Sequence, residues 1–265
     1  MRDMSTTIEE TGNDRDSAKF GRLRRFNVVM GFFHAIQAVA ILLLANDFAL
    51  PVTATFLDNA PGIEPPKVYQ LFEIRIAWGV AAFVLLSAIA HWAISSPGVY
   101  PWYLRNLEQG RNYARWIEYS VSSSLMVVLI AMLPGITDVA ALGGLFAVNA
   151  TMILFGLLME HYEKPGRPNW LSYWFGVFAG AVPWILIAIY LWSPSTDGSP
   201  PEFVYGIFFS LFVFFNSFAI NMVLQYKQVG KWGDYLYGER AYIILSLVAK
   251  SLLAWQVFAG TLAPS

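Results

Sequence analysis

The sequence predicts an all-α membrane protein, a bundle of seven transmembrane helices with a small β-hairpin in the first loop. Of its 265 residues, 57% are hydrophobic and only 13% are charged, whereas soluble domains carry about 25% charged residues. Seven mostly apolar runs reach the roughly 20 residues that an α-helix needs to cross a bilayer. Pro-Gly pairs at 97–98, 134–135 and 165–166 separate several of these runs. Lipid is therefore expected to be the main solvent of the folded chain.

The predicted elements follow from where the apolar runs stop. Residues 1–25 are polar and mixed in charge, which predicts a solvated tail before a membrane domain of residues 26–262. Residues 46–70 contain four prolines among β-branched residues, so this first loop is expected to form a hairpin. The spans are expected at 26–45, 71–94, 114–133, 139–162, 171–192, 203–226 and 235–261.

The positive charges predict the orientation. Short loops rich in Lys and Arg stay in the cytoplasm, and the tail and alternate loops hold twelve such residues against Lys67 alone in the opposite loops. The amino terminus is therefore expected in the cytoplasm and the carboxyl terminus outside, in a multi-pass protein of the cell membrane. The twelve are Arg2, Arg15, Lys19, Arg22, Arg24, Arg25, Arg105, Arg111, Lys164, Arg167, Lys227 and Lys231.

Composition also limits the chemistry. The chain has no cysteine, which removes disulfides, thiolate metal sites and thiol catalysis. Its formal net charge of −1 does not suggest a nucleic-acid partner. We identify no catalytic residues and do not expect an enzyme.

Lys250 is the most informative residue, because it lies in the middle of the last apolar run. A charged side chain at the bilayer centre costs roughly 2.5 to 3.5 kcal/mol on insertion scales, so it needs a partner or a function. One interpretation is a structural ion pair or a lysine that faces a water-filled cavity. The other is a lysine that forms a Schiff base, which requires a desolvated amine and a nearby anion. Ser246, one turn earlier, lies on the same helix face and is expected to hydrogen-bond the nitrogen or a water molecule that links to it.

Glu118 is the expected anion, because it is the only carboxylate well inside another span. The first two helices bring His34 with Gln37, and Ser87 with His91, to a similar depth. These polar groups predict a hydrated cavity in the cytoplasmic half. A zinc site is the rival explanation, and it is disfavoured because the sequence lacks a pair of ligands at i and i+4.

Three further charged residues lie near the predicted cytoplasmic edge. Arg115 and Glu239 are expected to pair and close the cavity, although two unrelated interface charges explain them equally well. Glu160 is expected to mark only the end of the fourth helix, together with His161.

The combination of these motifs resembles the heliorhodopsins. It consists of an inward amino terminus, Arg115-Trp116-Ile117-Glu118-Tyr119 in the third span, Ser246 through Lys250 in the last span, and the histidine pair. Ordinary microbial rhodopsins carry an aspartate where this chain has Ser246, and a second acid on the third helix.

The resemblance implies all-trans retinal on Lys250 as a Schiff base, Glu118 as its counterion and Ser246 as a hydrogen-bond partner. It also implies retinal contacts from Ser123, Met152, Trp174 and Phe215, and a homodimer that uses the first external loop. The predicted polar cavity comprises His34, Gln37, Ser87, His91, Arg115, Tyr119 and Glu239.

Three functions remain open from the sequence. The first is a light sensor that signals to an unknown cytoplasmic partner and does not pump ions, because no acid follows Glu118 or Lys250 along its helix toward the outside. A proton held in the cavity, with the histidines as acceptors, would prolong its signalling state. The second is a light-gated ion or proton conductance, or a weak transporter. The third is a protein without retinal, in which Lys250 and Glu118 form a structural ion pair.

Overall fold

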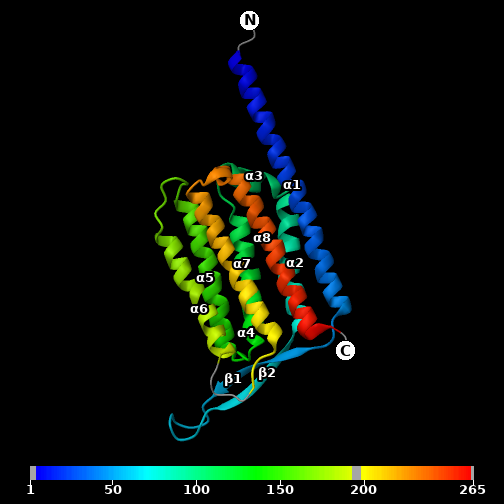
Figure 1. Cartoon of the computed structure of the whole chain (residues 1–265), viewed down its shortest axis with the longest axis vertical. Coiled ribbons are helices and arrows are strands. Elements are labelled where there is room, and N and C mark those ends of the chain that lie inside the picture. Colours follow the sequence, from blue (N-terminus) through cyan, green and yellow to red (C-terminus); the bar gives the residue numbers. More distant parts are fainter. Residues whose placement is uncertain (1–3, 193–197, 264–265) are drawn as a thin grey trace.

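Seven long helices run side by side in the part of the chain that the structure describes (Figure 1). The computed structural model describes residues 4–192 and 198–263, with side chains from residue 18 onward, so that Arg2 and the side chain of Arg15 lie outside the described part. The seven helices are α1 (Met4–Leu44), α2 (Ile76–Ser95), α4 (Tyr113–Met132), α5 (Val139–Tyr162), α6 (Leu171–Leu191), α7 (Glu202–Tyr226) and α8 (Tyr235–Val257). This confirms the predicted fold class.

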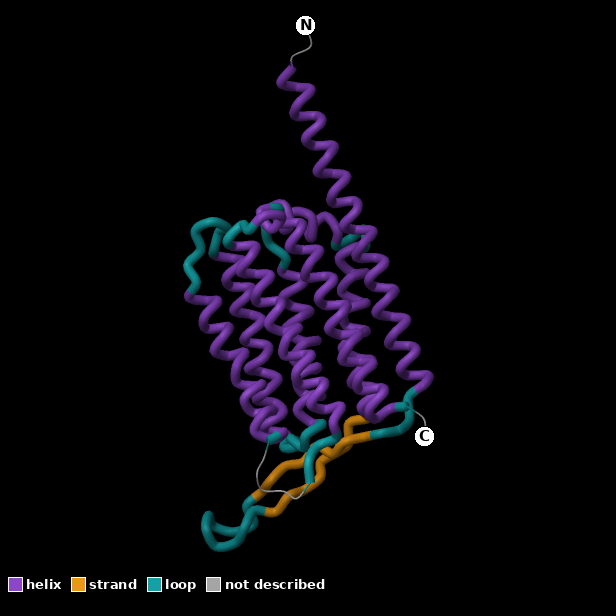
Figure 2. The backbone as a smooth tube through the Cα atoms, in the orientation of Figure 1, coloured by secondary structure: helices purple, strands orange, loops and turns teal. Residues whose placement is uncertain are grey.

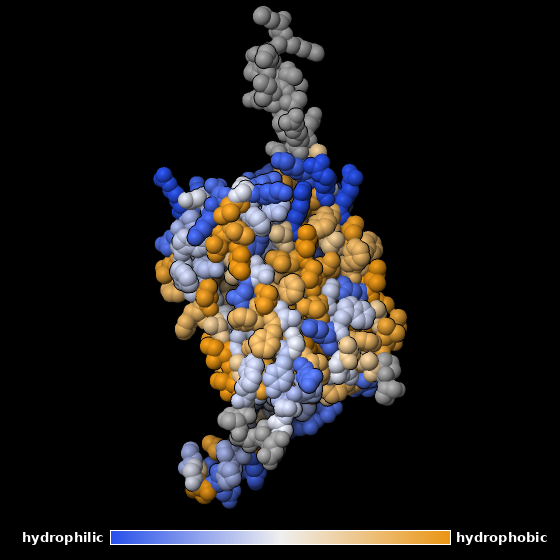
Figure 3. All heavy atoms as spheres, viewed as in Figure 1, coloured by the Kyte–Doolittle hydropathy of each residue, from blue (hydrophilic) through white to orange (hydrophobic). Residues whose placement is uncertain are grey.

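The surface of the bundle matches a protein in lipid. Six helices are long and apolar enough to cross a membrane among the described residues. On the face seen in Figure 3, apolar side chains cover much of the side of the bundle, and hydrophilic ones gather toward its ends. The seventh helix, α4, is more polar because it contains Arg115, Glu118 and four serines. It packs against α2, α5, α6 and α7, so its polar groups face protein instead of lipid.

Two helical features at one end of the bundle extend beyond the sequence prediction. Helix α1 begins at Met4 instead of residue 26 and projects past the other helices (Figures 1 and 2). A short helix, α3 (Tyr100–Glu108), follows α2 and buries Tyr103 and Leu107 against Leu23 and Leu236. The loops with the predicted cytoplasmic basic residues share this end, which we call the basic end.

The opposite end carries the hairpin and the carboxyl terminus (Figure 2). Strands β1 (Ala49–Phe56) and β2 (Lys67–Arg75) pair antiparallel from Ala49 with Arg75 to Phe56 with Lys67. Thr53 holds the hairpin to the bundle, because its backbone N–H donates to the carbonyl of Thr137 at 2.9 Å.

The hairpin corrects the predicted start of the second helix. Residues 71–75 belong to β2, and α2 begins at Ile76. In the strand these residues pair with β1, and the charged side chains of Glu73 and Arg75 stay at the surface, where Arg75 forms an ion pair with Asp47 at 3.0 Å. At the other end of the chain α8 stops at Val257 and continues as a π-helical turn, Phe258–Leu262.

The apolar core lies toward the hairpin end and closes that half of the bundle. Helix α4 supplies an unbroken buried run from Met126 to Met132, which packs with residues of α2, α7 and α8 such as Phe83, Ile207 and Leu253. The polar first half of α4 lies toward the basic end. This division places the candidate site in the basic half of the molecule.

Candidate functional site

Lys250 lies at the centre of the site, with only 3% of its surface exposed. Its Nζ lies 2.8 Å from Oε1 of Glu118 and also donates to the hydroxyl of Ser87. Ser87 in turn donates to the same oxygen of Glu118 at 2.7 Å. Helices α8, α4 and α2 therefore each supply one member of this contact. A buried ammonium is tolerated only with such a charge partner and hydrogen bonds.

Ser246 lies near Lys250, but another serine makes the direct contact with the nitrogen. It is buried one turn before Lys250 and lines an apolar cavity, while Ser87 supplies the hydroxyl that contacts the nitrogen. The reason is that Lys250 reaches across to α2 and α4 instead of bending back along its own helix. Tyr119 completes the surroundings, with its ring centroid 5.2 Å from Nζ.

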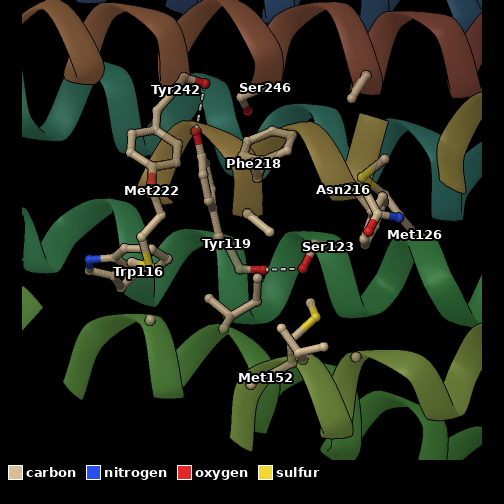
Figure 4. Close-up of a pocket in the computed structure, with 18 of the residues that line it drawn as sticks. Trp116, Tyr119, Ser123, Met126, Met152, Asn216, Phe218, Met222, Tyr242 and Ser246 are labelled. Atoms are coloured by element: carbon tan, nitrogen blue, oxygen red, sulfur yellow. Dashed lines mark hydrogen bonds between the residues drawn. The ribbon is translucent and has the colours of Figure 1, made fainter. Parts of the chain in front are cut away.

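The apolar cavity begins at Lys250 and has a volume of about 300 Å³. Figure 4 shows Tyr119 reaching across it from α4 to α8, where the hydroxyl donates to the carbonyl of Tyr242 at 2.9 Å. Rings form much of the wall, together with small residues of α6; the aromatic lining residues are Trp116, Tyr119, Tyr173, Trp184, Phe212, Phe215, Phe218 and Tyr242.

Three of the four side chains expected around a chromophore line this cavity, namely Ser123, Met152 and Phe215. Trp174 does not line it and is 62% exposed on the outer face of α6. The structure instead brings Trp184, three helical turns further along α6, to the wall, where it is buried against Phe215 with ring centroids 5.3 Å apart. Consecutive residues on a helix differ by about 100° in direction, so a sequence rich in aromatics does not indicate which ring faces inward.

A second, smaller cavity of about 40 Å³ lies on the other side of Glu118, toward the basic end. Of the predicted polar cavity it has Ser87, His91, Arg115, Tyr119 and Glu239, and it adds Asn27, Tyr103 and Asn112, which the sequence did not single out. Gln37 lies elsewhere, because its amide contacts the carbonyl of Phe33 and the indole of Trp255. We call this space the polar cavity.

The two histidines lie next to each other beside the polar cavity. Their rings stack with centroids 5.6 Å apart, and His34 is fully buried behind His91. Nδ1 of His91 lies 2.7 Å from Oδ1 of Asn27, whose amide nitrogen donates to the carbonyl of Leu23. Since that contact fixes the amide, His91 must carry its proton on Nδ1, which leaves Nε2 as an acceptor.

Three charged side chains close the polar cavity at the basic end, and we call Arg115, Glu160 and Glu239 the end cluster. Arg115 pairs with Glu239, as considered from the sequence, and also with Glu160 at 2.6 Å. The guanidinium stacks on the ring of Tyr242, with its Cζ 4.0 Å from the centroid. All three residues are buried.

Glu160 corrects the sequence-based interpretation that it marks only a helix end. Its carboxylate accepts from Arg115, from the indole of Trp116 at 2.5 Å, from the backbone of Asn112 at 2.8 Å and from Tyr235 at 3.1 Å. Its position at the end of an apolar run gave no hint of these partners, since they come from the starts of α4 and α8. Among the described residues no group of three His, Cys, Asp or Glu side chains is arranged to hold a metal ion.

Comparison with known proteins agrees with this geometry. The family model described as heliorhodopsin matches residues 23–262. The chain belongs to the heliorhodopsin family. No curated protein matches its sequence.

Two solved structures have a similar fold. The transmembrane domain and linker region of Salpingoeca rosetta rhodopsin phosphodiesterase is 13% identical, with a TM-score of 0.65, and the match covers 94% of this chain and 82% of that one. The light-driven proton pump LR (Mac) from Leptosphaeria maculans is 14% identical, with a TM-score of 0.63 and coverages of 89% and 94%. Membership of the family makes the chain a multi-pass, light-responsive membrane protein with a retinal chromophore.

Proposed function

We propose that this heliorhodopsin is a light sensor, in which retinal is held as a Schiff base on Lys250 with Glu118 as its counterion. One observation carries the proposal: the buried nitrogen of Lys250 stands between a carboxylate and an apolar, ring-lined cavity. A structural ion pair would explain the carboxylate but not the cavity. All-trans retinal bound there would supply light absorption and isomerisation, while Lys250 would hold it and Glu118 would balance the charge on the nitrogen.

The residues around the cavity fit a long apolar chromophore. Binding cavities for small ligands are mostly apolar with a few placed polar groups, and this cavity has its charged groups only at the Lys250 end. Ser123 adds a neutral polar atom to one wall, and its hydroxyl accepts a hydrogen bond of 2.9 Å from the amide of Asn149 behind it. The flat rings of Trp184 and Tyr119 offer the surfaces that would orient a polyene.

The bundle is apolar toward the hairpin and polar toward the basic end, and this difference supports sensing over pumping. A pump needs a proton path on both sides of the nitrogen, but α4 after Glu118 and α8 after Lys250 contain no acid. The buried apolar run from Met126 to Met132 fills the space toward the hairpin. Of the residues that line the two cavities, the carboxylates and the histidine lie on the side of the polar cavity, so a proton that leaves Lys250 is expected to move toward the basic end and to stay inside the protein.

We also propose that the basic end faces the cytoplasm. Two copies of the chain would form a homodimer, and this homodimer would bind an unidentified signalling partner in the cytoplasm. Twelve basic residues in the tail and alternate loops support this orientation. The hairpin offers exposed apolar side chains for contact between two copies, including Val68 at 67% and Phe72 at 53% exposure.

Adding all-trans retinal to the purified protein is expected to produce a visible absorption band, and Lys250→Ala is expected to abolish it. The reason is that only this amine stands at the cavity with a carboxylate beside it. Trp174→Ala is the matched control, and it should keep the band because Trp174 lies outside the cavity. A band that survives in Lys250→Ala would show that another group binds the chromophore.

Illumination of cells that contain the retinal-bound protein should produce no sustained change in external pH. The measurement is a pH electrode reading with and without an uncoupler, and cells with a known light-driven proton pump serve as the positive control. A sustained change that the uncoupler abolishes would contradict the sensor assignment and favour transport.

A further inference from the structure

The end cluster contains two carboxylates and only one cation, and this imbalance suits it to take up a proton. We propose that Glu239 is the final acceptor of the proton that leaves Lys250 after illumination. This inference rests on the proposed function and names the group that ends its proton transfer. The N–H bond at Lys250 breaks and an O–H bond forms on Glu239, so that one positive and one negative charge disappear and no further reactant is needed.

The charge count makes the end cluster a place where a proton is stabilised. Two carboxylates, Glu160 and Glu239, share the single cation Arg115, and all three side chains are at most 4% exposed. An uncompensated charge is costly away from water. One added proton removes this excess negative charge, which gives the end cluster a stronger attraction for a proton than a balanced ion pair has.

The hydrogen bonds decide which carboxylate takes the proton. Glu160 accepts hydrogen bonds from four donors, so a proton on this carboxylate would compete with a crowded set of contacts. Glu239 accepts from only two, Arg115 on Oε1 and the amide of Asn112 on Oε2 at 2.7 Å. Both oxygens of Glu239 thus accept in the resting state, which fits an ionised group, and protonation of Glu239 displaces fewer hydrogen bonds than protonation of Glu160.

The polar cavity provides the route. It is lined by Glu118 and Ser87 beside Lys250 and by Glu239 and Arg115 at the other end. Its volume of about 40 Å³ admits a few water molecules at roughly 10 to 15 Å³ of such space each. Water in a cavity with these polar walls can pass a proton from the counterion to the end cluster.

His91 is the rival acceptor, and charge favours Glu239. The titratable and charged side chains that line the polar cavity are His91 from α2, Arg115 and Glu118 from α4, Glu239 from α8, and Tyr103 and Tyr119. Protonation of His91 would create a new buried charge, which is costly away from water. Protonated Glu239 instead cancels a charge. The histidines then act as transient acceptors on the way to Glu239, because Nε2 of His91 carries no proton and can accept one.

Protonation of Glu239 has a structural consequence at the basic end. The hydroxyl oxygen of a protonated carboxyl is a weaker acceptor and carries no charge, so the contact of Glu239 with Asn112 or with Arg115 is weakened. Asn112 caps α4, where its Oδ1 accepts from the backbone of Arg115 at 3.0 Å, and its amide also reaches the hydroxyl of Tyr103 on α3. The proton would therefore loosen the junction of α3 and α4, where the bundle meets its basic loops.

Infrared difference spectra between light and dark test the inference, on the full chain with all-trans retinal in lipid nanodiscs. A carbonyl band of a protonated carboxyl should appear when visible absorption shows that Lys250 has lost its proton. Glu239→Gln should remove this band, and Glu239→Asp should shift its frequency. Glu163→Gln is the matched control, because Glu163 lies at the same end outside the end cluster and accepts from the backbone of Asn169. It should keep the band.

Several outcomes would overturn the assignment. One is a carboxyl band that persists unchanged in Glu239→Gln, provided that the dark visible band shows a folded protein. Another is a proton loss from Lys250 that is accompanied by imidazolium bands and no carboxyl band. If the unmodified protein forms no visible band with retinal, the proposed function itself fails, and that result is read from visible absorption before any infrared measurement.

Discussion

Glu118→Gln is expected to move the visible maximum of the retinal-bound protein to longer wavelength. The carboxylate of Glu118 lies 2.8 Å from the nitrogen of Lys250 and stabilises positive charge there. Excitation moves that charge away from the nitrogen, so the anion stabilises the ground state more than the excited state. Two unit charges about 4 Å apart interact by roughly 4 kcal/mol at an effective dielectric constant of 20. Loss of the anion should therefore lower the excitation energy by on the order of a few kcal/mol.

Ser87→Ala is the control for this prediction. It removes the hydroxyl that contacts both Lys250 and Glu118 but leaves the carboxylate in place. The maximum should then move much less than in Glu118→Gln, because a neutral dipole is lost and not a charge. Absorption spectra at a pH that keeps each variant's visible band decide the matter. An unchanged maximum in Glu118→Gln would mean that the counterion is another group.

The fold could be predicted from the sequence because membrane helices are defined by length and hydropathy. Five of the seven predicted spans both start and end within a few residues of the helices found. The exceptions have physical causes. Residues 71–75 are apolar enough to extend a helix, yet they pair with β1, and a strand partner is a non-local contact. Helix α3 is amphipathic and short, and it is held by Leu23 and Leu236 from distant parts of the chain.

The candidate site was predictable where a charge stands alone in an apolar run. Lys250 and Glu118 stand out for that reason, and the structure pairs them. Glu160 could not be identified in the same way, because an acid at the end of a membrane helix is ordinary and its four donors come from other segments. Asn27 and Asn112 were missed because neutral polar residues near helix ends are common. Trp174 was expected at the cavity from the resemblance. The sequence could not correct this, because packing decides which ring of α6 faces inward.

The largest loss of stability is expected from Arg115→Met. The guanidinium is the only positive charge in the end cluster, and its removal leaves Glu160 and Glu239 buried without a cation. Removal of one partner from a buried ion pair costs about 3 to 5 kcal/mol, because the other charge remains in a region of low dielectric constant. Methionine keeps much of the side-chain volume, so the loss comes mainly from charge. Thermal or detergent-induced unfolding, followed by loss of the visible band, measures it.

Glu239→Gln is the matched comparison and should cost far less, about 1 kcal/mol, since it leaves one cation opposite one anion and alters only a hydrogen bond. The pair of variants separates charge balance from the number of contacts, because each removes a partner from the same contact between Arg115 and Glu239. Equal losses in the two variants would show that the end cluster is held by packing and hydrogen bonds alone. A large loss confined to Arg115→Met would show that the end cluster carries excess negative charge, which is the property that makes Glu239 able to take up a proton.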